Sequence, residues 1–172
     1  MSPEDISRIR DGVIDDIIIA FECVSRENGV SLHEAQVIDE YGTETEKEEA
    51  RRLDTEGRWQ DVPDKDIERH NSILCFVDLI GWRYYLAAYM VWVLRNYLAS
   101  DSFSKDSTIY SLRIDKNSDL EEHFQQRFDI LSQEQSRSVC RFLRFMREYA
   151  EGRCDSNAAD EAIQFHWGQF CK

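Results

Sequence analysis

An acid and a guanidinium group flank a short turn-like stretch near the middle of the chain. Asp78 and Arg83 stand five positions apart, so their side chains can pair across a turn. Trp59, Asp61 and Tyr84 would complete an aromatic-lined pocket for a small polar ligand or a partner's side chain. The structural alternative is a carboxylate that locks the turn beside a neighbouring cation. Neither interpretation identifies a reaction, so the catalytic residues stay unknown.

Basic side chains form a second candidate site in the C-terminal half. Four arginines fall within about 120° of arc on one helix, opposite its apolar face. They are Arg137, Arg141, Arg144 and Arg147. In an acidic protein this stripe fits a docking face for an acidic surface, including the N-terminal half of a second copy. It also fits a solvated face whose charges pair within the chain, with Glu134, Glu148 or the acidic N-terminal region.

Metal-ligand and nucleophile signatures are absent from the sequence. The four histidines are scattered, and none lies in an H-E-x-x-H motif or beside a cysteine pair. No G-x-S-x-G, Walker or G-x-G-x-x-G motif occurs. We therefore predict no metal site and no cofactor.

The cysteines are five in number, widely spread and free of C-x-x-C spacing. The N-terminal residues lack the apolar run of an export signal. These features predict five reduced thiols in a cytoplasmic protein.

Capping signals define most of the elements that must position these residues. Ser2-Pro3 starts a helix that is expected to reach about residue 25. Ser31 with Glu34, and Thr43 with Glu46, have the spacing of capping boxes for two further helices. Helices are also expected near 119–129, 133–151 and 157–169, with a short strand at 109–114.

The longest apolar stretch, residues 75–94, lies between these helices. Residues 73–77 and 82–86 predict the two strands of a hairpin, with a turn at 78–81. From Ala87 to Leu98 the sequence is apolar nearly all round, which is typical of a buried helix. The prediction is therefore a mainly α (α+β) fold: a single globular domain over residues 1–172, with six to seven helices and one small β-hairpin.

The charge is large and uneven. The chain has a net charge of −13; residues 1–70 hold 20 acidic and 9 basic side chains, and residues 71–172 hold 14 and 12. Such a balance argues against nucleic acid and against an anionic membrane surface as partners. Residues 75–94 are not expected to span a membrane, because Asp78 and Arg83 lie inside the apolar run.

The stretch from Phe76 to Met90 resembles a family of uncharacterised bacterial proteins with the core F-x-D-x-x-G-x-R-[FY]-Y-L-P-A-Y-M. The matching positions include Asp78, Gly81 and Arg83, whereas Ala87 replaces the usual proline. The likeness covers residues 10–98 well and the C-terminal helices loosely. It implies a shared fold and supplies no activity.

These observations favour a small, acidic, cytoplasmic protein-interaction module without catalytic activity. Its partner would be another protein or a second copy of itself. The alternative is a small-molecule-binding protein or an enzyme, with a site around Asp78, Arg83, Tyr84 and Asp61.

Overall fold

The computed structural model describes residues 1–114 and 121–171, and all regular elements in these ranges are helical. The predicted β-hairpin is wrong, since no strand occurs among the described residues. The segment expected to be its first strand contains the 3-10 turn η2 (Ile73–Cys75), and the second lies within helix α5 (Leu79–Asn96). The strand expected at 109–114 is also wrong, because helix α6 (Ser104–Tyr110) and a turn occupy it.

The N-terminal helices begin where their capping residues predict. Helix α1 (Pro3–Ala20) starts after Ser2, and it ends earlier than expected. Helices α2 (Leu32–Asp39) and α3 (Glu44–Arg51) follow Ser31 and Thr43. The capping box of α3 is reciprocal, whereas at α2 the Ser31 N–H donates to Glu34 Oε2 (3.0 Å) and the Ser31 hydroxyl has no partner among the described residues. In a capping box the side chains replace intrahelical partners that the first turn lacks.

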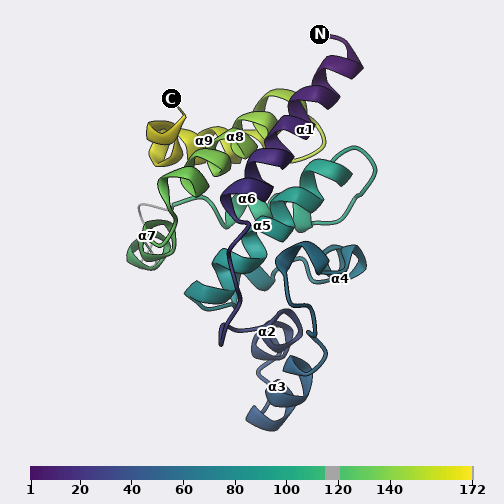
Figure 1. The fold of residues 1–172 in the computed structure, drawn as a ribbon, viewed down its shortest axis with the longest axis vertical. Coiled ribbons are helices and arrows are strands. Elements are labelled where there is room, and N and C mark those ends of the chain that lie inside the picture. Colours follow the sequence, from purple (N-terminus) through teal and green to yellow (C-terminus); the bar gives the residue numbers. More distant parts are fainter. Residues whose placement is uncertain (115–120, 172) are drawn as a thin grey trace.

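Helix α5 runs through the middle of the molecule (Figure 1), and every residue from Tyr84 to Leu94 is buried. Its start is set by Asp78, whose Oδ1 accepts hydrogen bonds from the N–H groups of Gly81 (2.8 Å) and Val30 (3.0 Å). A Cβ at Gly81 would lie 2.5 Å from the Val30 carbonyl oxygen, so only glycine allows this approach of the two segments.

Short elements connect α3 to α5, and further helical elements form the C-terminal part of the chain. A 3-10 turn, η1 (Trp59–Asp61), and helix α4 (Asp64–Arg69) precede α5. The remaining elements follow α6 in the sequence; they are α7 (Glu121–Asp129), α8 (Gln133–Tyr149), α9 (Ser156–Phe165) and η3 (Trp167–Phe170). The helix start expected at 119 lies outside the described residues. Helix α8 packs against α1 and α9, whereas α2 and α3 lie together at the opposite end (Figure 1).

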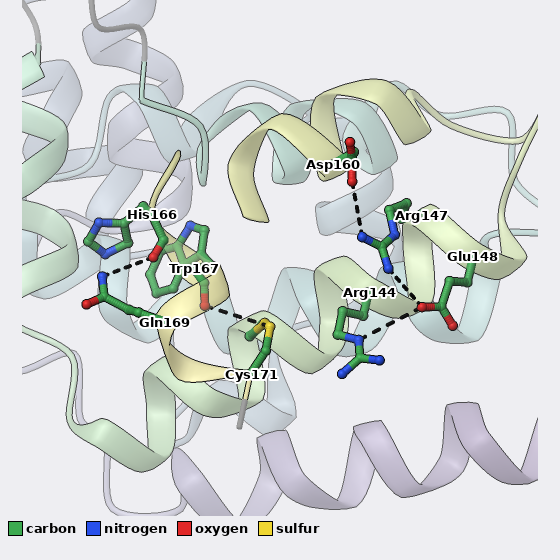
Figure 2. Close-up of a disulfide and its surroundings, with 9 residues drawn as sticks. Arg144, Arg147, Glu148, Asp160, His166, Trp167, Gln169 and Cys171 are labelled. Atoms are coloured by element: carbon green, nitrogen blue, oxygen red, sulfur yellow. Dashed lines mark hydrogen bonds and ion pairs between the residues drawn. A yellow bond between two sulfur atoms is a disulfide. The ribbon is translucent and has the colours of Figure 1, made fainter. Parts of the chain in front are cut away.

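The prediction of five reduced thiols is wrong for two cysteines in the C-terminal half of the chain. Cys140 of α8 and Cys171, which follows η3, form a disulfide with their Cα atoms 5.6 Å apart (Figure 2). Cys23, Cys75 and Cys154 are free. The pairing joins residues 31 positions apart, and only the packing of η3 on α8 brings them together.

Over the described ranges, no helix has both the length and the apolar content needed to cross a membrane. This includes α5, which forms the core of the protein in place of the predicted hairpin.

Candidate functional site

Three of the five residues of the predicted ligand pocket, Asp78, Asp61 and Trp59, each have a partner outside that set. Asp78 caps the start of α5, whereas the structural alternative expected its carboxylate to lock a hairpin turn. Asp61 lies at the surface and pairs with Arg58 (Nη2 to Oδ1, 2.9 Å), a hydrogen bond that lowers the pKa of Asp61. Trp59 is buried and donates its indole N–H to the Phe21 carbonyl oxygen (2.9 Å). No hydrogen bond or ion pair between described residues joins these side chains to one another.

The other two members of that set lie on neighbouring positions of α5. Arg83 is half-buried, and its Nε has no hydrogen-bond partner among the described residues. Tyr84 is fully buried, and its hydroxyl also lacks a partner there. Burial raises the pKa of Tyr84 above its usual range, so the side chain stays neutral and cannot act as a base.

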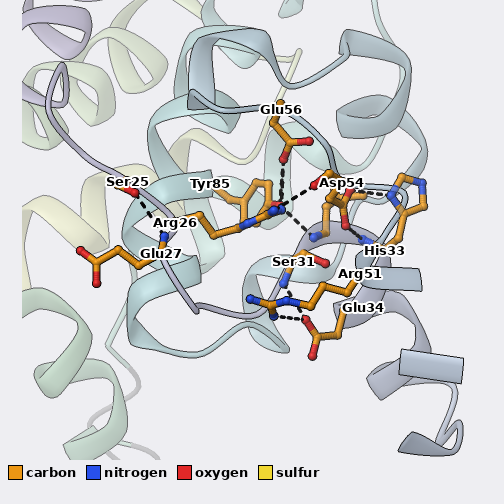
Figure 3. Close-up of polar contacts among 11 residues, drawn as sticks. Ser25, Arg26, Glu27, Ser31, His33, Glu34, Arg51, Asp54, Glu56 and Tyr85 are labelled. Carbon is orange, nitrogen blue, oxygen red and sulfur yellow. Dashed lines mark hydrogen bonds and ion pairs between the residues drawn. The ribbon is translucent and has the colours of Figure 1, made fainter. Parts of the chain in front are cut away.

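A polar network beside Tyr84 joins α5 to the segments around α2 (Figure 3). Arg26 donates to the Tyr85 hydroxyl (2.8 Å), to Glu56 Oε1 (3.2 Å) and to the Asp54 carbonyl oxygen (2.9 Å). The Tyr85 hydroxyl in turn accepts from the backbone N–H of Leu32 (2.9 Å) and donates to Glu56 (3.2 Å). Burial raises the pKa of Tyr85, which keeps it a neutral member of this network.

The same network positions a histidine at the start of α2. Asp54 accepts from the backbone N–H of His33 through Oδ2 (2.9 Å), and its Oδ1 lies 2.6 Å from His33 Nδ1 (Figure 3). Because a carboxylate only accepts, this contact places the imidazole proton on Nδ1. The free nitrogen of His33 is then Nε2, which can bind a metal or accept a proton.

A second histidine, His70, follows the end of α4, and its ring lies against the ring of His33. The two rings have centroids 4.9 Å apart in an edge-to-face arrangement. The Tyr89 hydroxyl of α5 donates to the His70 carbonyl oxygen (2.5 Å). Burial, followed by the nearby charges of His33 and Arg69, lowers the pKa of His70, so this imidazole is neutral at pH 7.

An acid completes this group. Asp66 lies on α4 four positions before His70, and one ligand atom each from His33, Asp66 and His70 falls within 4.8 Å of the others. We call these three residues the His–Asp cluster. Sequence reasoning missed it, because His33 and His70 are 37 positions apart and no motif spans them. The only local signal was the spacing of Asp66 and His70, which brings side chains to one face of a helix.

The arginine stripe of α8 is largely paired within the chain. Arg141 forms an ion pair with Asp16 of α1. Arg147 contacts Asp160 of α9 (3.1 Å) and Glu148 (3.0 Å). These contacts agree with the internal-pairing interpretation of the stripe.

The two remaining arginines differ from each other. Arg144 reaches Glu148 at 3.9 Å, at the limit of an ion pair (Figure 2). Arg137 forms no ion pair with any residue that the structure describes. It lines a groove of about 380 Å³ between the end of α1 and the start of α8. Ile19, 73% exposed, lies on the α1 side of this groove.

Comparisons with known proteins match this chain to one family model. A family model matches residues 9–170, and its description is "Family of unknown function (DUF6714)". No curated protein and no solved structure matches the chain.

Proposed function

Since the chain belongs to the family of unknown function DUF6714, we propose a function from its own surface: it binds another protein in the α1–α8 groove. The partner segment presents a carboxylate beside an apolar side chain. The observation that carries this proposal is the pairing of an exposed isoleucine with an arginine that lacks an ion pair, at one open groove.

The apolar half of this surface is Ile19, with Ala20 beside it. Burying a side chain such as isoleucine contributes roughly 1.5–3 kcal/mol relative to leaving it in water. A partner that covers Ile19 therefore gains free energy from a residue that the isolated chain leaves exposed. Single exposed apolar residues are common, so the charge beside it gives the surface its selectivity.

The charged half is Arg137. Glu134, a groove acid on the same helix, accepts a hydrogen bond from the Ser132 hydroxyl (3.1 Å) and interacts with Arg137 through charge alone, without an ion pair. Asp16, on the other wall, pairs with Arg141. An incoming carboxylate would therefore meet a guanidinium that forms no ion pair with any described residue. The net charge of −13 opposes an acidic partner at long range, but screening limits this repulsion to about 8 Å at physiological salt.

The test begins with capture of a partner from native lysate, followed by affinity measurement on the two purified proteins. Arg137→Glu should weaken binding by roughly ten-fold or more, and Ile19→Glu by a similar factor. Neither change should alter the melting curve much, because both side chains are exposed and Arg137 forms no ion pair with any described residue. The proposal fails if both variants bind the captured protein normally.

A matched control is Arg8→Glu, which reverses a 79% exposed side chain of α1 outside the groove. Its affinity should match that of the unmodified protein. Equal losses for Arg8→Glu and Arg137→Glu would show a response to net charge alone, and would exclude the groove as the binding site.

A further inference from the structure

We propose that His33, Asp66 and His70 form a binding site for a divalent transition-metal ion of the zinc type. The three side chains come from two elements, with His33 in the first turn of α2 and the other two from α4 and its C-terminal end. This site is independent of the α1–α8 groove, to which none of the three residues belongs.

The distances are close to those that a metal requires. Around a tetrahedral ion with bonds of about 2.0–2.1 Å, ligand atoms lie roughly 3.3 Å apart. In this structure they all lie within 4.8 Å of one another. Asp66 has no hydrogen bond or ion pair through its carboxylate to any described residue, so rotation of this short side chain can close the remaining gap.

Hydrogen bonds behind the ligands hold both imidazoles in the form that a metal binds. Asp54 keeps the proton of His33 on Nδ1, at 2.6 Å, and leaves the Nε2 lone pair available. His70 Nδ1 lies 3.4 Å from Gln36 Oε1, an acceptor that favours the same tautomer. A carboxylate or amide behind a ligating histidine is the usual arrangement at metal sites, because it fixes the ring and raises its basicity.

The donor set restricts the class of metal. Two imidazole nitrogens and one carboxylate oxygen suit zinc, cobalt, nickel or iron, whereas calcium and magnesium prefer sites made entirely of oxygen. Three protein ligands leave at least one position for water or for another ligand. His70 is 8% exposed and the His33 side chain 24% exposed, so the cluster is shielded yet reachable from solvent.

The competing explanation is a His33–Asp54 hydrogen bond with a second histidine packed against it, and no affinity for metal. It accounts for the ring contact and for Asp54. It gives no role to Asp66, whose carboxylate lies within 4.8 Å of a nitrogen of each imidazole and has no hydrogen bond or ion pair to any described residue. Asp66 therefore separates the two explanations.

The experiment is a titration of tag-free, metal-stripped protein with zinc, followed by calorimetry, and with cobalt, followed by visible absorption. We expect one ion per chain and a cobalt band that changes when a protein nitrogen ligand is lost. Asp66→Asn should weaken zinc binding by roughly ten-fold or more, and His70→Ala should remove the cobalt band. His123→Gln, an exposed histidine outside the cluster, should leave both signals unchanged.

Two results would overturn the proposal. One is unmodified protein that takes up no stoichiometric zinc, and the other is Asp66→Asn protein that binds zinc as tightly as unmodified protein. If His70→Ala does not fold, Asp66→Asn still decides the question, because that carboxylate forms no hydrogen bond or ion pair with any described residue. Circular dichroism of each variant verifies the fold.

Discussion

Asp78 illustrates at the scale of one residue how a charged side chain can resemble a site and serve the fold. Its carboxylate accepts the N–H groups of Gly81 and Val30, and so fixes both the start of α5 and the segment before α2. Asp78→Ala should destabilise the protein by roughly 1–2 kcal/mol, the usual cost of losing an N-cap. Asp78→Asn keeps an acceptor and should cost less. Urea unfolding of the three proteins measures this, and equal midpoints would contradict the capping role.

His166 gives a prediction on pH. Its ring packs between Phe128 and Trp167, with centroids 4.8 Å from each, and burial lowers its pKa. A histidine whose pKa is lower in the folded protein than in the unfolded chain contributes fully to folding stability above the unfolded pKa of about 6.5. This contribution is lost as the pH falls from that value toward the folded pKa. The free energy of unfolding should therefore fall less between about pH 7.5 and about pH 5.5 for His166→Gln protein than for unmodified protein. Identical drops would show that His166 does not contribute.

The hydroxyl group of Tyr89, on α5, makes a hydrogen bond that cannot be predicted from the sequence. It is buried and donates to the His70 carbonyl oxygen (2.5 Å), which ties the end of α4 to the central helix. Tyr89→Phe should destabilise by roughly 1–3 kcal/mol, because it leaves a buried acceptor without a donor. Tyr110→Phe removes a surface hydroxyl bonded to Asp155 (2.9 Å), and should cost less than about 1 kcal/mol. Chemical denaturation measures the free energy of unfolding of both variants. Equal losses for Tyr89→Phe and Tyr110→Phe would contradict a structural role of the buried hydroxyl.

Helix starts could be predicted from sequence, because capping is local. A capping side chain lies next to the backbone group that it bonds, as in Ser2, Thr43 and Ser132, so its type and spacing identify the boundary. The hairpin prediction failed for a related reason. A run that is apolar on all sides has no period, so residues 73–86 fit buried strands or a buried helix equally well. Asp78 and Gly81 were interpreted as a turn, whereas they begin a helix.

The candidate sites depended on packing that no local pattern shows. The arginine stripe was visible from helical spacing, but its partners Asp16 and Asp160 lie on other helices. The His–Asp cluster needs α2 and α4 to meet. The Tyr85 hydroxyl ties the start of α2 to α5, and the Tyr89 hydroxyl ties the end of α4 to the same helix. Sequence spacing identifies metal sites only when the ligands share one element or one motif.

For the molecule as a whole, the resemblance in the sequence is confirmed as membership of a family of unknown function. Its bacterial origin, its core motif and the cytoplasmic location stay predictions.

The disulfide can be measured on the intact chain. Alkylation of unfolded protein without reductant should label three of the five cysteines, because Cys140 and Cys171 are paired. Prior reduction should raise the count to all five, and Cys171→Ser protein should show four without reduction. Mass spectrometry counts the labels, and five labels before reduction would restore the original prediction of reduced thiols.

The central claim is that α2 and α4 meet at one coordination site. The most direct measurement is anomalous X-ray diffraction at the zinc edge from crystals grown with zinc chloride. We predict a peak about 2.0–2.2 Å from nitrogen atoms of His33 and His70 and from a carboxylate oxygen of Asp66. A map with zinc only elsewhere on the acidic surface, and none between these three side chains, would contradict it.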